Sequence, residues 1–158
     1  MNELVIDTPR LRLVLDSTEA VLARIDALSP ADRAEVSPHW LAQMRSAAPS
    51  PWTHGFTVVE RATNSPVGSG GYKGPPDADS IVEIAYGIDA EHRGRGYAKE
   101  VAAALTRYAF GADVRLVRAH TRAESGPSPR VLAHCGFTHI GEVVDPEDGL
   151  VWRWELRR

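Results

Sequence analysis

The segment of residues 82–100 constrains this chain most, because it predicts an apolar strand, a glycine-interrupted basic turn and a helix in immediate succession. Gly94 and Gly96 have no Cβ, so the backbone of the turn can adopt positive φ angles and approach a ligand closely. The first amides of a helix starting near Ala98 have no acceptor within the helix, and its dipole adds about half a positive charge there. With an arginine before each glycine, the segment predicts a pyrophosphate site.

Two alternatives compete with a pyrophosphate site at this turn. A helix can follow a glycine turn simply because the chain must turn, which would leave Arg93 and Arg95 solvated. A nucleotide-binding α/β domain is the second alternative, but the dinucleotide fingerprint fits less well because Lys99 occupies the position of its third glycine. The Walker A pattern of paired glycines followed by Lys and Ser or Thr does not occur in the sequence.

The hexapeptide Arg93–Ala98 has the form Arg/Gln-x-x-Gly-x-Gly/Ala, which resembles the acyl-CoA pyrophosphate loop of the GCN5-related N-acetyltransferases, the GNAT superfamily. Four more segments, in that family's order, resemble the branch that acetylates ribosomal-protein N-termini: Thr8–Leu13, Glu83–Gly87, Ser128–Leu132 and Cys135–Phe137. This resemblance covers nearly the whole chain. It implies an α/β GNAT fold, with a mixed central sheet of splayed strands flanked by helices, and acetyl-CoA as acyl donor.

The order of predicted elements agrees with an α/β mixed sheet. Strands are predicted at 11–15 on a sheet edge, then at 56–60, 67–72, 81–88, 114–120, 137–144 and 150–156. Helices are predicted from an Asp16 cap to about Leu28, after Ser29-Pro30 and Ser37-Pro38, over 98–110 before Gly111, and over 130–134. The crossover helix between strands 81–88 and 114–120 predicts that these two strands pair in parallel.

Composition restricts the remaining possibilities. At 158 residues, with 43% hydrophobic and 25% charged residues, the chain is expected to form one domain over residues 1–158. An acidic start, no apolar run of about 20 residues and a lone Cys135 predict a cytoplasmic protein without a membrane partner. The net charge of −3 does not favour nucleic acid, and the six histidines lack metal-ligand spacing, so no metal is expected. A homodimer is possible.

The resemblance also assigns roles to individual residues. Glu83, on the strand that enters the turn, matches the position of a general base, with a surface or arginine-paired glutamate as the alternative. Ser128 matches a serine beside the cofactor sulfur, with helix capping as the alternative. Leu132 occupies the position where many members place a tyrosine acid, and Ser125 replaces an asparagine. The expected cofactor-binding residues are Tyr86, Gly87, Ile88, Arg93, Gly94, Arg95, Gly96, Tyr97, Ala98 and Ser125.

The acceptor side is less defined than the donor side. Trp40, Trp52, His54 and Tyr72 come from segments that line the acceptor site in this family, but such side chains are more often part of a core. The sequence therefore favours an acyl-CoA-dependent N-acyltransferase, most readily an acetyltransferase acting on a protein N-terminus or a small-molecule amine. The missing tyrosine and the Ser125 substitution support a second hypothesis, a slow or non-catalytic acyl-CoA-binding sensor or partner module.

Overall fold

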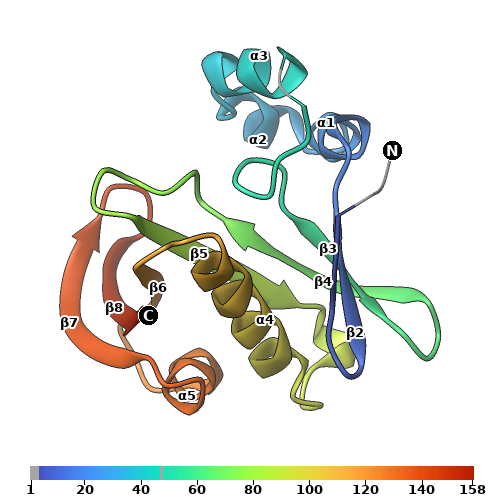
Figure 1. Cartoon of the computed structure of the whole chain (residues 1–158). Coiled ribbons are helices and arrows are strands. Elements are labelled where there is room, and N and C mark those ends of the chain that lie inside the picture. The colour runs from blue at the N-terminus through green and yellow to red at the C-terminus, as the bar shows by residue number, and fades with distance from the viewer. Residues whose placement is uncertain (1–3, 47) are drawn as a thin grey trace.

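A computed structural model describes residues 4–46 and 48–158 (Figure 1). Its strands form one eight-stranded sheet in the order β1-β2-β3-β4-β5-β6-β8-β7. All neighbouring strands are antiparallel except β5 and β6. The strands are β1 (Val5–Asp7), β2 (Leu11–Leu15), β3 (Phe56–Glu60), β4 (Ser65–Tyr72), β5 (Ile81–Ile88), β6 (Leu116–Arg122), β7 (Thr138–Asp145) and β8 (Gly149–Arg157). The predicted α/β mixed sheet and the parallel pair are confirmed.

Three helices lie between β2 and β3 and gather at one end of the sheet in Figure 1: α1 (Thr18–Asp26), α2 (Pro30–Ala34) and α3 (Pro38–Ser46). Ser29 and Ser37 cap the second and third as predicted, accepting from Asp32 N at 3.2 Å and Trp40 N at 3.3 Å. The predicted Asp16 cap is wrong, because the Ser17 hydroxyl caps α1.

Asp16 is instead buried and connects α1 with β3. Its carboxylate pairs with Arg24 and accepts a hydrogen bond from the Thr57 hydroxyl at 2.6 Å. The predicted edge position of strand 11–15 is also wrong, since β1 pairs outside β2 with Val5 opposite Val14. A three-residue strand gives too short an alternation to be recognised in sequence.

The helices around the turn differ from the prediction mainly at their ends. Helix α4 (Tyr97–Gly111) includes Gly111, and the chain reverses at Asp113, which has φ of 68°. Helix α5 (Pro127–His134) starts earlier than predicted, because a proline in the first helical turn removes no intrahelical hydrogen bond. The short 3-10 helix η1 (Ala90–His92) precedes the glycine turn.

The parallel pair opens part-way along its length. Register runs from Ile81 opposite Leu116 to Ile84 opposite Ala119. Beyond that point β5 continues to Ile88 beside β4, while β6 continues to Arg122 beside β8. The two strands therefore splay, as the family resemblance implied, and leave their facing edges unpaired over the last residues of each strand.

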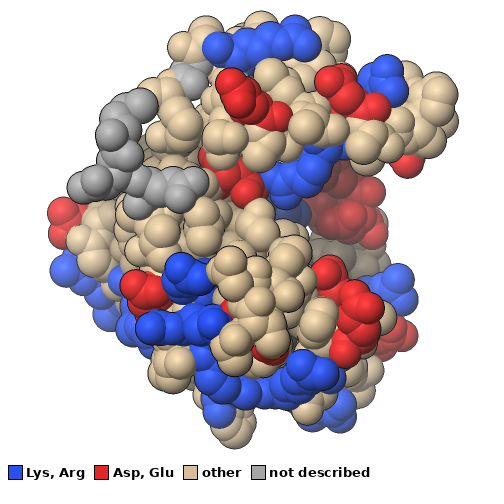
Figure 2. All heavy atoms as spheres, turned by 90° about the vertical axis from the view of Figure 1, so that its right-hand side faces the viewer, with Lys and Arg blue, Asp and Glu red and all other residues tan. Residues whose placement is uncertain are grey.

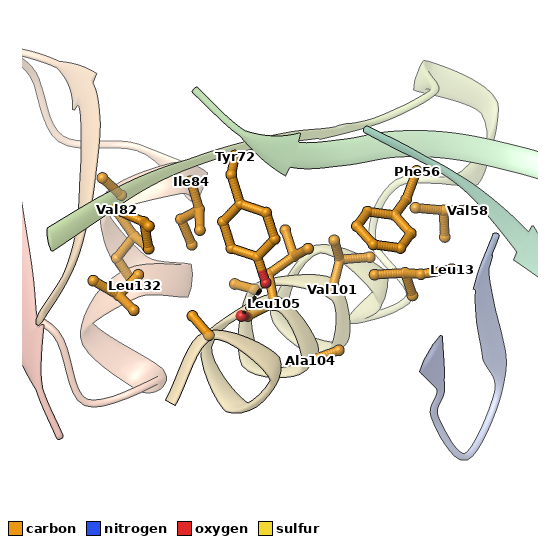
Figure 3. Packing of buried hydrophobic residues seen from close by; sticks show 14 of the residues in the cluster. Leu13, Phe56, Val58, Tyr72, Val82, Ile84, Val101, Ala104, Leu105 and Leu132 are labelled. Carbon is orange, nitrogen blue, oxygen red and sulfur yellow. Dashed lines mark hydrogen bonds between the residues drawn. The ribbon is translucent and has the colours of Figure 1, made fainter. Parts of the chain in front are cut away.

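The hydrophobic core lies between the sheet and α4 (Figure 3). Val101 and Leu105 of α4 are fully buried beneath the strands. The hydroxyl of Tyr72, at the end of β4, donates to the Leu105 carbonyl at 2.6 Å and fixes the helix to the sheet.

Candidate active site

The glycine turn forms the predicted backbone cradle at the start of α4. Gly94 and Gly96 have φ of 79° and 81°, a region that favours glycine, and Gly96 is the N-cap of the helix. The first intrahelical bond runs from Glu100 N to Gly96 O, so the amides before Glu100 have no acceptor within the helix. These donors and the helix dipole favour an anion.

A groove of about 780 Å³ lies beside this cradle. It is closed on its other side by α5, and its lining is rich in basic and titratable groups from both helices. The lining residues are Tyr86, Gly87, Ile88, His92, Arg93, Gly94, Gly96, Tyr97, Ala98, Lys99, Pro127, Ser128, Arg130, Val131 and His134. Eight of the ten residues expected to bind cofactor therefore line one groove.

Arg95 and Ser125 are the two expected cofactor residues outside the groove lining. Arg95 is half exposed, lies 3.5 Å from Glu60 Oε2, and accepts a hydrogen bond from Arg10 at its carbonyl. Ser125 is exposed in the loop before α5. Their roles in binding cofactor stay predictions.

Two groove residues also have structural partners. The Nε of Arg93 donates to the Ile88 carbonyl at 2.9 Å and closes the loop on itself. The Tyr97 hydroxyl donates to Glu60, and the Arg10 guanidinium lies 4.7 Å above the Tyr97 ring. Figure 2, which views the molecule from the right-hand side of Figure 1, shows Lys and Arg side chains beside Asp and Glu side chains on that face.

A second cavity, of about 490 Å³, occupies the opening between β5 and β6. It is lined by Lys73, Glu83, Ile84, Ala85, Tyr86, Ala119, His120, Thr121, Arg122, Ser128, Leu132, Asp148, Leu150 and Val151. Tyr86 and Ser128 line this cavity and the groove alike. The two predicted catalytic residues, Glu83 and Ser128, thus share one cavity next to the cradle.

Glu83 lies at the centre of a polar cluster in this cavity. Its Oε2 is 3.0 Å from Lys73 Nζ and 3.1 Å from His120 Nδ1, and its side chain is 22% exposed. Burial lowers the pKa of Lys73, but the hydrogen bond and charge of Glu83, with Asp148 and Asp145, outweigh it and raise the pKa. The carboxylate of Glu83 thus pairs with a lysine, and the arginine pairing considered as an alternative is wrong.

Arg118, which the sequence offered as that arginine partner, pairs with Glu155 at 2.7 Å. Arg118 of β6 is in register with Glu83 of β5 on one side and with Glu155 of β8 on the other. Its side chain pairs with Glu155. This leaves Glu83 to the cavity and to Lys73.

His120 is the main residue that sequence reasoning missed. Its side chain is 8% exposed, and its Nε2 accepts from the Nε of Arg153 at 3.1 Å. Because arginine can only donate, the proton of a neutral imidazole lies on Nδ1, the nitrogen that is near Glu83. The N–H is not directed along the line to Glu83 Oε2, so Nδ1 is buried without a regular hydrogen bond.

Ser128 and Leu132 lie on α5. The N-cap of this helix is Gly126, and Ser128 is inside the first turn, so the capping alternative for Ser128 is wrong. Leu132 is 1% exposed and belongs to the core cluster. The helix therefore presents an apolar side chain to the cavity where many relatives were expected to place a tyrosine acid.

A third cavity, of about 490 Å³, is lined by Arg24 of α1 and by residues of β4 and β5, and it shares Lys73, Ala85 and Tyr86 with the second. His54 lines it and is buried, with Nε2 at 2.8 Å from the Thr18 hydroxyl. Burial lowers the pKa of His54, partly offset by Asp16. Tyr72 also lines it and packs 4.8 Å from Trp52, centroid to centroid.

Within the described part of the chain, no helix is long and apolar enough to cross a membrane, and no three His, Cys, Asp or Glu side chains are placed to share a metal ion.

The fold and the two joined cavities define a class: an α/β domain whose splayed strands open beside a helix start with free backbone amides. Residues 6–138 match the family model described as "Acetyltransferase (GNAT) domain". The chain therefore belongs to the GNAT acetyltransferase family, as the sequence motifs indicated.

Individual relatives are distant. The "Uncharacterized N-acetyltransferase YjdG" of Bacillus subtilis is 29% identical over 89 residues, 54% of this chain and 53% of that protein. The chain spans about half the length of the curated relatives it matches.

Two solved structures with the same fold are named for different acceptors. A RimL ribosomal L7/L12 alpha-N-protein acetyltransferase in complex with coenzyme A has a TM-score of 0.72 at 18% identity, over 98% of both chains. A spermidine N-acetyltransferase SpeG chimera from Vibrio cholerae and hSSAT has a TM-score of 0.71 at 16% identity, over 94% of this chain and 95% of the other. At these identities the likeness concerns the fold.

Proposed function

We propose that this chain is an acyl-CoA-dependent N-acetyltransferase that acetylates a primary amine. The observation that carries the proposal is the junction of the two cavities at Tyr86 and Ser128. One cavity carries an anion cradle, and the other carries a carboxylate with hydrogen-bonding neighbours. Family membership supports the same activity.

The groove fits acetyl-CoA. Gly94 and Gly96 expose the backbone donors that a pyrophosphate needs, and Arg93, Lys99 and Arg130 add positive charge along the groove. The unpaired edge of β5 at Gly87 can pair with an extended amide chain such as pantetheine. When bound, acetyl-CoA supplies an activated acetyl thioester.

Glu83 is proposed as the general base. An amine with a pKa near 10.4 is neutral in about one molecule in 2,500 at pH 7, which is equivalent to about 4.6 kcal/mol. The Glu83 carboxylate is partly buried and lies within hydrogen-bond reach of an amine in this cavity, which is the position that a general base needs. Ser128, at the junction, is proposed to donate a hydrogen bond near the departing sulfur.

Isothermal titration and thiol release test the proposal together. Purified protein should bind acetyl-CoA, and it should release free thiol with at least one member of a panel of N-terminal peptides, polyamines and small amines. Binding without thiol release would instead support the sensor or partner module, which the apolar Leu132 favours. Thermal protection by ATP or NAD but not by acetyl-CoA would contradict both. A cytoplasmic location and a possible homodimer stay predictions.

A further inference from the structure

We propose that Lys73 is an intramolecular acceptor, so that the protein acetylates its own Lys73 when no external amine fills the site. The proposal rests on the proposed function and adds a modification site to it. Its first support is distance: Lys73 Nζ lies 3.0 Å from Glu83 Oε2. This is the contact that an acceptor amine must make with the base.

The backbone holds Lys73 at this position. Lys73 directly follows β4, and its N–H donates to the Glu83 carbonyl at 2.9 Å, which aligns the two residues across neighbouring strands. Lys73 lines both the cavity between the splayed strands and the third cavity. An external amine that contacts Glu83 Oε2 therefore competes with Lys73 for this oxygen.

The same cavity leads to the donor. Tyr86 and Ser128 line both the cofactor groove and the cavity that contains Lys73. A thioester bound at this junction would therefore lie at the cavity that Lys73 also lines. Among the residues that line this cavity, Lys73 is the one with a side-chain amine, because Arg122 carries a guanidinium that stays protonated.

The sequence makes this site distinctive. The chain contains two lysines, Lys73 and Lys99, among 18 basic residues. Lys99 lines the cofactor groove, on the other side of the junction from Glu83. The remaining basic residues are arginines, so only Lys73 and Lys99 offer a side-chain amine that could be acetylated.

The step balances without a further reactant. Glu83 accepts one proton from the Lys73 ammonium, and the neutral Nζ attacks the thioester carbonyl carbon. The N–C bond forms as the C–S bond breaks, and the second proton of the amine goes to the coenzyme A thiolate. The products are Nε-acetyl-Lys73, coenzyme A and the proton held by Glu83.

The reaction is slow and occurs once per molecule. The raised pKa of Lys73 makes its neutral form rarer than that of a free lysine, so the rate should rise about tenfold per pH unit in the neutral range. Acetylation removes the cation from Glu83 and leaves His120 as its neighbour. A bound external amine suppresses the step by displacing Lys73.

Mass spectrometry with peptide mapping tests the proposal on the full chain. With acetyl-CoA and no acceptor, Lys73 should gain one acetyl group at a first-order rate independent of protein concentration, at least about tenfold faster than Lys99. Lys73→Arg should abolish this signal. Equal labelling of both lysines, or a rate that rises with protein concentration, would overturn the proposal.

Glu83→Gln separates transfer within the site from chemical acetylation. In wild-type protein Glu83 suppresses the reactivity of Lys73 toward acetic anhydride, because it stabilises the ammonium form. The substitution should therefore increase labelling by acetic anhydride and decrease labelling by acetyl-CoA. An increase with both reagents means simple chemical acetylation and refutes the proposal.

Failure of this proposal differs from failure of the proposed function. Thiol release with an external amine but an unmodified Lys73 refutes self-acetylation alone. Acetyl-CoA binding with neither thiol release nor a modified Lys73 refutes both.

Discussion

Replacing Glu83 with glutamine tests the catalytic assignment most directly. Glutamine keeps the size of the side chain and removes the charge that accepts a proton. Loss of a general base costs about 10²–10⁴ in rate, so kcat for a good amine acceptor should fall at least about 100-fold. The Kd for acetyl-CoA should change by less than about twofold, because Glu83 lines the cavity between the strands and not the groove.

The structure predicts a small effect of the same substitution on stability. The Glu83–Lys73 pair has side chains that are 22% and 41% exposed. A pair this exposed contributes about 0–1 kcal/mol, so Tm should fall by no more than about 4 °C. A large fall in kcat with an almost unchanged Tm separates chemistry from unfolding.

Glu155→Gln is the matched control. Glu155 is also a partly buried carboxylate on the sheet, paired with Arg118 at 2.7 Å, but it does not line the cavity. Steady-state kinetics, titration calorimetry and thermal unfolding of both variants complete the assay. If Glu83→Gln retains more than about a third of wild-type kcat, or if Glu155→Gln loses as much, Glu83 is not the base.

Three further substitutions, the first with a control variant, test the cradle, an ion pair and the core. Gly96→Val should abolish acetyl-CoA binding in calorimetry, because the φ of Gly96 is 81° and a Cβ there would lie 3.2 Å from Arg10 Nη2. Gly111→Ala is the control: it should bind acetyl-CoA normally and gain about 0.5–1 kcal/mol in stability. Burial raises the pKa of Glu100, but hydrogen bonds from Thr8 and Arg10 have the larger combined effect, so its pKa is lowered from the usual 4.5. That stabilisation is present above pH 4.5 and is lost as pH falls through the lowered pKa, so Glu100→Gln should flatten the pH dependence of unfolding there. Phe56→Ala, at a side chain 1% exposed, should cost about 3–5 kcal/mol and lower Tm by about 10 °C in calorimetry, and a smaller loss would mean the core there is loosely packed.

The parts of the site that depend on neighbouring residues in the chain could be predicted from sequence. The glycine turn and α4 form one local unit, so the residue types at Gly94 and Gly96 determine both the backbone conformation and the free amides. Strand β5 could be predicted from its own β-branched and apolar residues. Local preference and final structure agree in this unit.

The polar cluster around Glu83 could not be predicted in the same way. Its members come from three different strands or strand ends, and they meet only through the register of β4, β5 and β6. The alternation of Arg118, His120 and Arg122 did place His120 on the polar face of its strand, which was a usable signal. The choice of ion-pair partners could not be predicted from sequence. Arg118 pairs with Glu155, and Glu83 pairs with Lys73.

The missing tyrosine at Leu132 can be weighed against what the cavity retains. In the proposed reaction, a thiolate with a pKa near 8.5 that leaves unprotonated at pH 7 costs about 2 kcal/mol. Deprotonating the amine costs about 4.6 kcal/mol, more than twice as much. The cavity retains Glu83, the base proposed for the larger of these costs. An apolar Leu132 therefore removes help from the easier step, and for this reason we propose a working acetyltransferase rather than a cofactor sensor.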